Sequence, residues 1–254
     1  MKSQIKALLP SVVLHSIARL RRKWQQWQNR RRSTEQVFTE IYAKNLWGGQ
    51  PGEFDSGYGS AEAYAVSPYL ASVRQLAQIH GFAGKRFVDL GCGDFRVGRE
   101  LTALSSQYIG IDVVRGLIER NRAAFATAEI SFSHLNIVSE ELPDGDVCFV
   151  RQVLQHLSNQ QISQVLPKLA KYRWVLITEH YPSDNPQIVA NKDKAHGGDI
   201  RLFDNSGVYL TQAPFNLPPA RVQLVLEVRG AGADTSSDHG VIRTYLHTPQ
   251  FDVV

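Results

Sequence analysis

Residues 85–98 read Lys-Arg-Phe-Val-Asp-Leu-Gly-Cys-Gly-Asp-Phe-Arg-Val-Gly, and this stretch decides the fold. The apolar residues within 86–90 predict the end of a buried strand. The Gly-Cys-Gly sequence at 91–93 then predicts a tight turn, and a helix is expected over 95–104. Glycine lets a backbone approach a ligand closely, and the N–H groups of a helix N-terminus point outward at it. The stretch therefore predicts a cradle for a nucleotide-like cofactor.

The turn lacks the third glycine of a dinucleotide-binding fingerprint, because Arg96 stands at that position. Asp89 places a carboxylate at the end of the strand, where it would repel the pyrophosphate of NAD. S-adenosylmethionine has no phosphate, and it carries an ammonium and a sulfonium group. These charges favour S-adenosylmethionine over NAD, and a glycine turn with a purely structural role is the remaining alternative.

A second acidic strand end strengthens this interpretation. Residues 107–112 predict a strand that ends in Asp112, one strand–helix–strand unit after the first, where an acid can hold ribose hydroxyls. The segments 88–93 and 110–112 resemble the class I S-adenosylmethionine-dependent methyltransferases, many of which have glycine at the position of Phe95. The resemblance implies an α/β fold with a Rossmann-like, seven-stranded, mostly parallel sheet. An antiparallel final strand, helices on both faces and additional N-terminal helices complete it.

The resemblance also implies which residues bind the cofactor, because ligands in such sheets lie at the carboxyl ends of the strands. Asp89 would hold the methionine ammonium, Asp112 the ribose hydroxyls and Asn136 the adenine amino group. The full expected set is Asp89, Gly91, Cys92, Gly93, Asp112, Val113, Asn136, Ile137, Arg151 and Gln152.

Composition and pattern divide the chain into three parts. Residues 1–33 predict a basic amphipathic helix, residues 34–80 a helical segment with a lid loop, and residues 81–254 the methyltransferase domain. The domain includes an irregular insert over 181–220. We expect this insert to bind the acceptor, because a long ordered segment of this kind is usually functional.

Local signals predict the elements within these parts. A helix is expected over 34–45, and a glycine- and aromatic-rich lid loop follows over 46–60. Ser67 and Pro68 predict the start of a helix over 68–79. Further elements alternate as in an α/β sheet: helices over 114–126 and after Ser158, and strands over 130–135, 146–150, 173–180, 221–229 and 241–247.

The net charge of +4 is unevenly distributed. Residues 1–34 contain nine basic and no acidic side chains, whereas residues 35–254 contain 19 basic and 24 acidic ones. The body is therefore acidic, which argues against a nucleic-acid methyltransferase. A basic tail that serves as an electrostatic handle keeps that alternative open.

The basic tail has a helical apolar period. Apolar side chains recur every three or four residues, at Ile5, Leu9, Val13, Ile17, Leu20, Trp24 and Trp27. Pro10 is expected to kink or interrupt the helix. A basic amphipathic helix with tryptophan is typical of a segment that adsorbs to anionic lipid, and the apolar run is too short to span a bilayer. Docking onto protein and a signal peptide ending near Ala18 are the alternatives.

Cys92 and Cys148 both fall at strand-associated positions of the predicted core. We expect reduced thiols and no disulfide. The sequence shows no metal-ligand spacing, so no metal site is expected. These features favour a cytoplasmic enzyme, which the tail can hold at the inner face of the membrane.

Three histidines are candidates for a general base, because histidine titrates near neutral pH. His156 and His180 lie at the carboxyl ends of predicted strands, and His196 lies in the insert. Each of them can instead have a structural role. Arg201 is a candidate partner for an anionic group of the acceptor, or else forms a surface ion pair.

Further motifs indicate a group within this superfamily. Residues 47–49, 56–60, 90–95 and 151–157 resemble bacterial methyltransferases associated with surface-polysaccharide or modified-sugar biosynthesis, although many relatives have an acid where Gln152 stands. This resemblance implies methyl transfer to a small-molecule or glycan acceptor, most simply a hydroxyl of a sugar or polysaccharide precursor. A nucleic-acid methyltransferase and a catalytically silent cofactor-binding scaffold are the alternatives.

Overall fold

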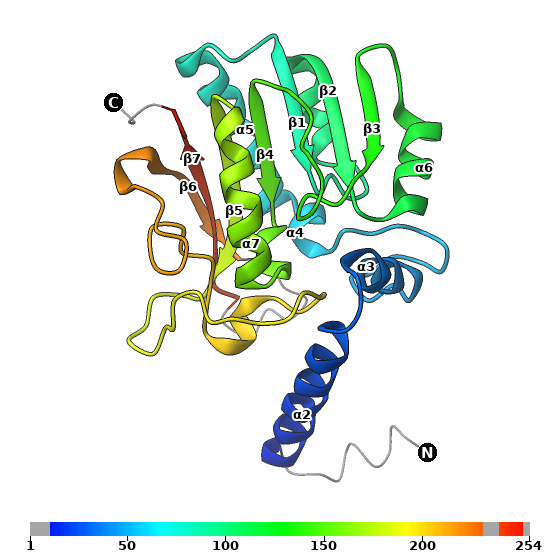
Figure 1. Ribbon diagram of the computed structural model, residues 1–254, viewed down its shortest axis with the longest axis vertical. Coiled ribbons are helices and arrows are strands. Elements are labelled where there is room, and N and C mark those ends of the chain that lie inside the picture. Colours follow the sequence, from blue (N-terminus) through cyan, green and yellow to red (C-terminus); the bar gives the residue numbers. More distant parts are fainter. Residues whose placement is uncertain (1–10, 231–238, 251–254) are drawn as a thin grey trace.

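Seven strands form one sheet in the order β3-β2-β1-β4-β5-β7-β6 (Figure 1). Strands β1 to β5 are parallel, and β7 runs antiparallel between β5 and β6. The expected Rossmann-like sheet with an antiparallel final strand is thus confirmed. The structure, a computed structural model, describes residues 11–230 and 239–250. Its strands are β1 (Lys85–Leu90), β2 (Ser105–Asp112), β3 (Ile130–His134), β4 (Val147–Arg151), β5 (Trp174–Tyr181), β6 (Val222–Arg229) and β7 (Val241–His247).

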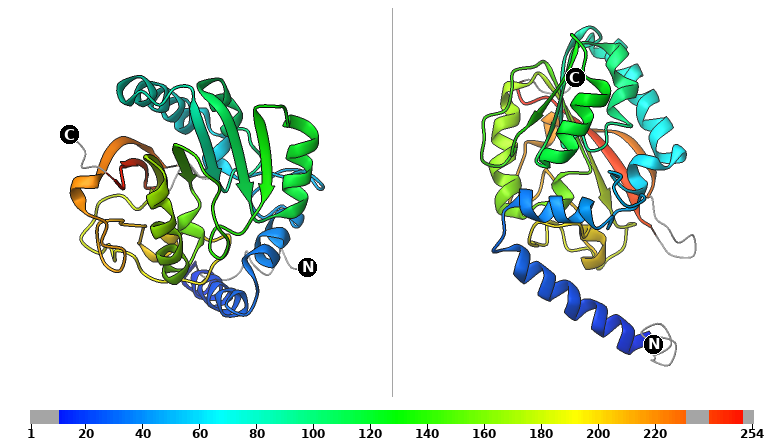
Figure 2. Two further views of the ribbon diagram at one scale, coloured as in Figure 1. Left: turned by 45° about the horizontal axis from the view of Figure 1, so that its top comes forward. Right: turned by 90° about the vertical axis from the view of Figure 1, so that its right-hand side faces the viewer.

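Helices flank both faces of the sheet (Figures 1 and 2). The α-helices are α2 (Ser11–Asn29), α3 (Thr34–Ala43), α4 (Tyr58–Ala61), α5 (Ala63–His80), α6 (Arg115–Phe125) and α7 (Asn159–Val165). Short 3₁₀-helices are η1 (Gly98–Leu104), η2 (Leu154–His156), η3 (Leu166–Lys171), η4 (Arg201–Asp204) and η5 (Pro219–Arg221).

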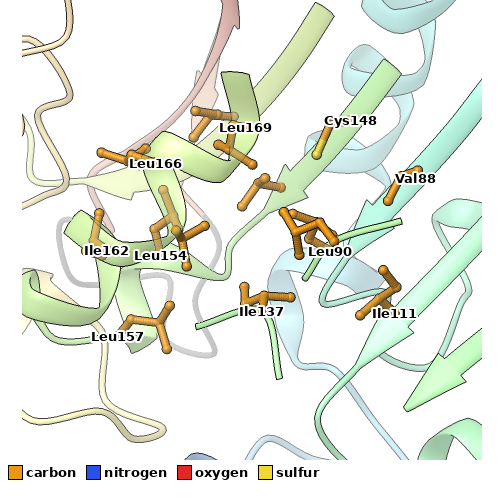
Figure 3. Close-up of a cluster of buried hydrophobic side chains, with 14 of the residues drawn as sticks. Val88, Leu90, Ile111, Ile137, Cys148, Leu154, Leu157, Ile162, Leu166 and Leu169 are labelled. Carbon is orange, nitrogen blue, oxygen red and sulfur yellow. The ribbon is translucent and has the colours of Figure 1, made fainter. Parts of the chain in front are cut away.

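The alternation of side chains along β1 divides the core into two layers. Val88 and Leu90 belong to a cluster that includes residues of α3 and α7, whereas Phe87 faces a cluster that includes residues of α5. Figure 3 shows part of the first cluster, with side chains of β1, β2 and β4 directed at those of η2, α7 and η3. Because β1 is buried on both faces, it fixes the glycine turn that follows it.

The helix start expected at Ser67 is wrong. Helix α5 instead runs straight through Pro68, which lies inside it. Ala65 and Tyr69 are both buried, so the apolar face of the helix already begins before the proline. Burial of this face outweighs the loss of the one backbone hydrogen bond that proline cannot donate.

The α-helix expected over 95–104 is also wrong. Phe95 has a φ of +68°, which is incompatible with an α-helix, and the chain then forms the 3₁₀-helix η1. At Gly98 an added Cβ would lie 2.4 Å from the hydroxyl oxygen of Tyr108, so the backbone lies close against β2. The cradle is therefore formed by the glycine turn without an α-helix N-terminus.

Helix α2 confirms the expected helix over the described part of the tail. It extends away from the body of the protein and joins it only toward its C-terminal end (Figures 1 and 2). Ile5, Leu9 and Pro10 of the expected pattern lie outside the described residues. Among the helices that the structure describes, none is long and apolar enough to cross a membrane.

The insert over 181–220 contains little regular structure beyond η4, as expected, yet several of its polar side chains are buried. Lys194 donates a hydrogen bond to the carbonyl oxygen of Asp199 at 2.6 Å, and Arg201 donates to that of Lys192 at 2.6 Å. Asn191 donates to the carbonyl oxygens of Tyr209 and Ala213. Hydrogen bonds from side chains to its own backbone therefore stabilise the insert, in place of the backbone-to-backbone hydrogen bonds of a helix or sheet.

Candidate active site

A pocket lies at the carboxyl ends of β1, β2 and β4 and encloses about 1110 Å³ of empty space, part of it open to solvent. This is the position where open α/β sheets bind ligands. Helix α3 and the lid loop contribute further walls. The sequence-predicted residues that line the pocket are Asp89, Gly91, Cys92, Asp112, Val113, Asn136, Ile137, Arg151, Gln152 and His156.

The glycine turn after β1 requires glycine at two positions. Gly91 has a φ of +79° and Gly93 a φ of +53°, in the left-handed region that disfavours other residues. A Cβ at Gly91 would lie 2.4 Å from Cγ2 of Val153, and one at Gly93 would lie 2.3 Å from Oγ of Ser56. The turn is therefore tightly enclosed between η2 and the lid loop. Gly93, unlike Gly91, does not itself line the pocket.

Asp89 ends β1 as a buried carboxylate. It accepts a hydrogen bond of 2.7 Å from the hydroxyl of Tyr108, and burial raises its pKa to about 6. The positive charge of Arg151 opposes that rise. An ammonium group bound nearby would stabilise the ionised carboxylate further.

Asp112 ends β2 and is fastened to the glycine turn. Its carboxylate accepts hydrogen bonds from the backbone N–H groups of Gly93 at 3.2 Å and Val114 at 3.0 Å. Burial raises its pKa to about 6, and the backbone hydrogen bonds oppose that rise. Each carboxylate oxygen accepts several hydrogen bonds at once, so both retain capacity for ligand hydroxyls.

Arg151 and Gln152 bring donors to the pocket that lack a partner among the described residues. Arg151 donates to the carbonyl oxygen of Gly59 at 2.6 Å and lies 5.0 Å from the ring centre of Tyr69, while its Nε is buried without a partner. The side-chain amide nitrogen of Gln152 is likewise buried without a partner. A buried donor of this kind is costly unless a ligand satisfies it, and a carboxylate would do so.

The lid loop closes over the glycine turn through contacts that the sequence did not reveal. The backbone N–H of Ser56 donates to the carboxylate of Asp94, and the N–H of Asp94 donates to Oγ of Ser56, both at 2.9 Å. Arg96 bridges Asp55 at 3.0 Å and Asp94 at 2.9 Å. Arg96 therefore occupies the position of the third glycine of a dinucleotide fingerprint, and its ion pairs also hold the lid loop against the glycine turn. The sequence predicted a lid loop over 46–60 but none of these hydrogen bonds or ion pairs.

Asn136 is held at the end of β3 by its own contacts. Its amide oxygen accepts from the N–H of Val138 at 3.0 Å, and its amide nitrogen donates to Oγ1 of Thr34 at 3.1 Å. Apolar neighbours Ile137 and Val113 line the same part of the pocket. Both ends of the Asn136 amide are thus engaged by protein groups, Thr34 of α3 and Val138, and its predicted contact with the adenine amino group stays a prediction.

An aromatic wall forms another side of the pocket, and His156 is part of it. The ring centres of Trp47 and His156 lie 5.1 Å apart, and those of Trp47 and Phe38 lie 5.9 Å apart. Nδ1 of His156 lies 3.1 Å from the carbonyl oxygen of Gly197, so it carries the proton and Nε2 is the acceptor. Burial lowers the pKa of His156 to about 3. His156 is therefore a neutral acceptor within the pocket.

Glu179 holds the segment that carries these residues, and the sequence did not indicate this. It is fully buried on β5 and accepts hydrogen bonds from the backbone N–H groups of Val153 at 3.2 Å, Leu154 at 2.8 Å and Gln155 at 3.0 Å. Burial raises its pKa to about 8, and the three backbone hydrogen bonds oppose that rise. Glu179 thereby fixes the position of η2 and of His156.

The other two histidine candidates do not line the pocket. Nε2 of His180 contacts the carbonyl oxygen of His239, and Nδ1 of His196 lies 3.3 Å from the amide nitrogen of Gln161. No residue of 181–220 is among those that line the pocket, and the insert contacts the lining residues Trp47, His156 and Leu157. Arg201 is buried and donates to the carbonyl oxygens of Lys192 and Leu157.

Cys92 and Cys148 are buried free thiols, as expected. Burial raises the pKa of both thiols well above the ordinary value. Among the described residues, no group of three or more His, Cys, Asp and Glu side chains could hold a metal ion.

Comparison with known proteins identifies the domain that this pocket belongs to. Residues 87–172 match the family model of a methyltransferase domain. The chain carries an S-adenosylmethionine-dependent methyltransferase domain. The glycine turn, the acidic strand ends and the donors without partners at Arg151 and Gln152 are consistent with that cofactor. No curated protein matches the sequence.

Two crystal structures of one protein share the fold of this methyltransferase. The N-methyltransferase NodS from Bradyrhizobium japonicum WM9, in complex with S-adenosyl-L-homocysteine, aligns with a TM-score of 0.56 and 11% identity over 83% of this chain and 98% of that chain. A second crystal structure of NodS aligns with a TM-score of 0.52 and 13% identity over 74% of this chain and 98% of that chain. The YcgJ protein from Bacillus subtilis has 17% identity and a TM-score of 0.38 over 46% of this chain, which spans about half of that protein's length (53%). At these identities, the two NodS alignments support the fold alone.

Proposed function

We propose that this methyltransferase transfers a methyl group to a small-molecule or glycan acceptor, specifically a hydroxyl group of a sugar or polysaccharide precursor. One observation carries the acceptor class: the pocket joins a carboxylate-lined cradle to an aromatic wall of Phe38, Tyr42 and Trp47 with a neutral His156. A sugar ring presents C–H faces that pack on aromatic rings and hydroxyl edges that need hydrogen-bond partners.

The cradle supports a division of labour among the residues that face the cofactor. When bound, S-adenosylmethionine supplies a methyl group activated by its sulfonium charge. Asp89 would pair with the ammonium group, Arg151 and Gln152 would donate to the carboxylate, and Asp112 would accept from the ribose hydroxyls. Holding the acceptor in line with the methyl group can contribute up to roughly 7–11 kcal/mol to catalysis.

His156 would orient the acceptor hydroxyl. Its Nδ1–H is directed at Gly197, and Nε2 lies 3.4 Å from the side-chain amide nitrogen of Gln155, a long hydrogen bond that the O–H group of an acceptor would replace. When the acceptor oxygen takes the methyl group and S-adenosylhomocysteine leaves, Nε2 of His156 would accept the hydroxyl proton and release it to solvent. An alkylated oxygen is a far stronger acid than an imidazolium ion, so a base with a lowered pKa suffices.

Binding calorimetry and a transfer assay test this proposal in sequence. S-adenosylhomocysteine is titrated into the purified chain beside NAD, and binding of the first without the second is expected. Transfer of radiolabelled methyl groups is then measured to monosaccharides and nucleotide sugars, with small amines, DNA and RNA in parallel. Transfer to amines or nucleic acid alone would refute the acceptor class, and binding without any transfer would support the scaffold alternative.

The variant His156→Asn separates the role of the base from cofactor binding. An asparagine amide can keep the N–H donated to Gly197 while removing the lone pair at Nε2. We expect unchanged affinity for S-adenosylhomocysteine and a fall in turnover of about 10²-fold or more. His180→Asn is the matched control, because His180 lies outside the pocket lining, and it should retain turnover.

We also propose that the reaction takes place in the cytoplasm, at the inner face of the membrane. The two buried free thiols support a reducing compartment. The excess of basic side chains over residues 1–34 supports contact with an anionic surface.

A further inference from the structure

An apolar strip lies uncovered along α2. Leu20, Trp24 and Trp27 are 67%, 60% and 50% exposed, although large apolar side chains are usually covered. Intervals of four and three residues place them on one side of the helix. Phe203 of the insert, itself 56% exposed, lies beside the helix, because the guanidinium of Arg22 stands 4.8 Å from its ring centre. We call these four side chains the α2 strip.

Basic side chains surround the α2 strip. Over residues 17–32 the chain has no Asp or Glu. The basic side chains of this segment are Arg19, Arg21, Arg22, Lys23, Arg30, Arg31 and Arg32. Arg32 pairs with Glu40 at 2.5 Å, and within the described residues the structure gives none of the other six an ion pair. The surface is thus apolar along a line and positively charged at its margins.

We infer that the α2 strip and its basic margins dock this protein on an anionic lipid bilayer. The inference rests on the proposed location at the inner membrane face and not on the identity of the acceptor. Tryptophan side chains bind preferentially at the membrane–water interface, and arginine and lysine extend from there to anionic headgroups. A nucleic-acid duplex would use the charge but would leave the apolar line of the strip exposed to water. An anionic bilayer provides headgroups for the basic side chains and an apolar region for the tryptophan side chains.

Docking at α2 would be transmitted to the wall of the pocket. The buried side-chain amide of Asn29, the last residue of α2, donates to the carbonyl oxygen of His196 at 3.0 Å and so ties the helix end to the insert. Helix α3 begins at Thr34, and Thr34, Phe38 and Tyr42 line the pocket. A bilayer bound at α2 would therefore lie one short connection away from the residues that enclose the active site.

Vesicle co-sedimentation of the full chain tests this inference. The probes are vesicles of phosphatidylcholine alone and vesicles with roughly a third phosphatidylglycerol, at low and at high salt. We expect binding to the phosphatidylglycerol vesicles at low salt, with a blue shift of tryptophan fluorescence, and little binding to neutral vesicles. Absence of binding to the anionic vesicles would overturn the inference.

Variants assign the binding to the α2 strip. The double variant Trp24→Ser/Trp27→Ser should weaken the apparent partition by about tenfold or more, and Arg19→Glu/Lys23→Glu should do likewise at low salt. Ile79→Ser is the matched control, because Ile79 is 65% exposed on α5, and it should bind vesicles as the wild type does. All variants should keep their affinity for S-adenosylhomocysteine, which shows that the body is folded.

Two other outcomes would also overturn it. If light scattering finds a dimer that the double tryptophan variant converts to a monomer, and vesicles do not bind, the strip is an interface between copies of the chain. If RNA or DNA binds through the arginines with no dependence on the tryptophans, the tail is a nucleic-acid handle. Methyl transfer to a soluble acceptor depends on none of these results, so the proposed function is tested separately.

Discussion

Acid titration of His156 offers a quantitative test of how deeply this ring is buried in the pocket wall. A free histidine has a pKa of about 6.5, and burial between Phe38 and Trp47, with Lys194 nearby, lowers that of His156 to about 3. A lowered histidine pKa means that the folded state resists protonation. Its stabilising contribution is fully present above pH 6.5 and is lost as the pH falls toward 3.

The expected size of the effect follows from these two pKa values. At pH 5 the unfolded chain has taken up a proton at His156 and the folded chain has not, which lowers the free energy of unfolding by about 2 kcal/mol relative to pH 7.5. The variant His156→Asn has no proton to gain there. The difference in unfolding free energy between wild type and variant should therefore change by about 2 kcal/mol over this range.

Urea denaturation followed by circular dichroism at pH 7.5, 6 and 5 measures this difference. The difference in unfolding free energy between wild type and variant at pH 7.5 measures the packing that the variant loses. Only the change of this difference with pH measures the titration of His156. His180, His196 and His247, whose pKa values burial also lowers, titrate in both proteins and cancel in the comparison. Parallel stability curves for wild type and variant would refute the argument that His156 is a buried neutral acceptor.

Three further substitutions test the cradle and its support. Gly91→Ala places a Cβ 2.4 Å from Val153 at a left-handed φ, so we expect a loss of about 1–3 kcal/mol in unfolding free energy and at least tenfold weaker binding of S-adenosylhomocysteine by calorimetry. Asp112→Ala removes the proposed ribose acceptor and should weaken the same binding roughly 10–100-fold, and unchanged affinity would remove it from the site. Glu179→Gln replaces one of the two accepting oxygens by an NH2 group, which then faces at least one of the three backbone N–H groups. Thermal or chemical denaturation should show a loss of about 2–3 kcal/mol in unfolding free energy, and an unchanged stability would contradict the role of Glu179 in supporting η2.

Sequence patterns with a local cause were read correctly. The apolar strand of 86–90, the Gly-Cys-Gly turn and the acids at Asp89 and Asp112 predict a parallel strand–turn unit, and the structure has it. The missing third glycine at Arg96 and the charge of Asp89 together favoured S-adenosylmethionine over NAD. The seven-stranded, mostly parallel sheet with an antiparallel final strand followed from the family resemblance and was confirmed, and the order of the strands came from the structure.

Patterns in which a local signal competes with burial were misread. The signal of Ser67 and Pro68 for a helix start was overruled by the buried face of α5, and the helix expected at Phe95 was overruled by a left-handed residue in the turn. The ion pairs of Arg96 with Asp55 and Asp94 join the lid loop to the glycine turn. These two segments lie about forty residues apart in the sequence, so no local periodicity could predict their contact.

The histidines show most clearly what only the tertiary structure decided. His156, His180 and His196 are equivalent in sequence terms, since each is a lone titratable group beside a strand end or in a loop. Folding places His156 alone in the pocket wall, through its contacts with Trp47 from the lid and Gly197 from the insert. The sequence by itself determined the sheet and the cofactor cradle, because strand, turn and acid are neighbours along the chain. The proposed acceptor side was decided by the tertiary structure, because its residues come from segments that meet only when the chain is folded.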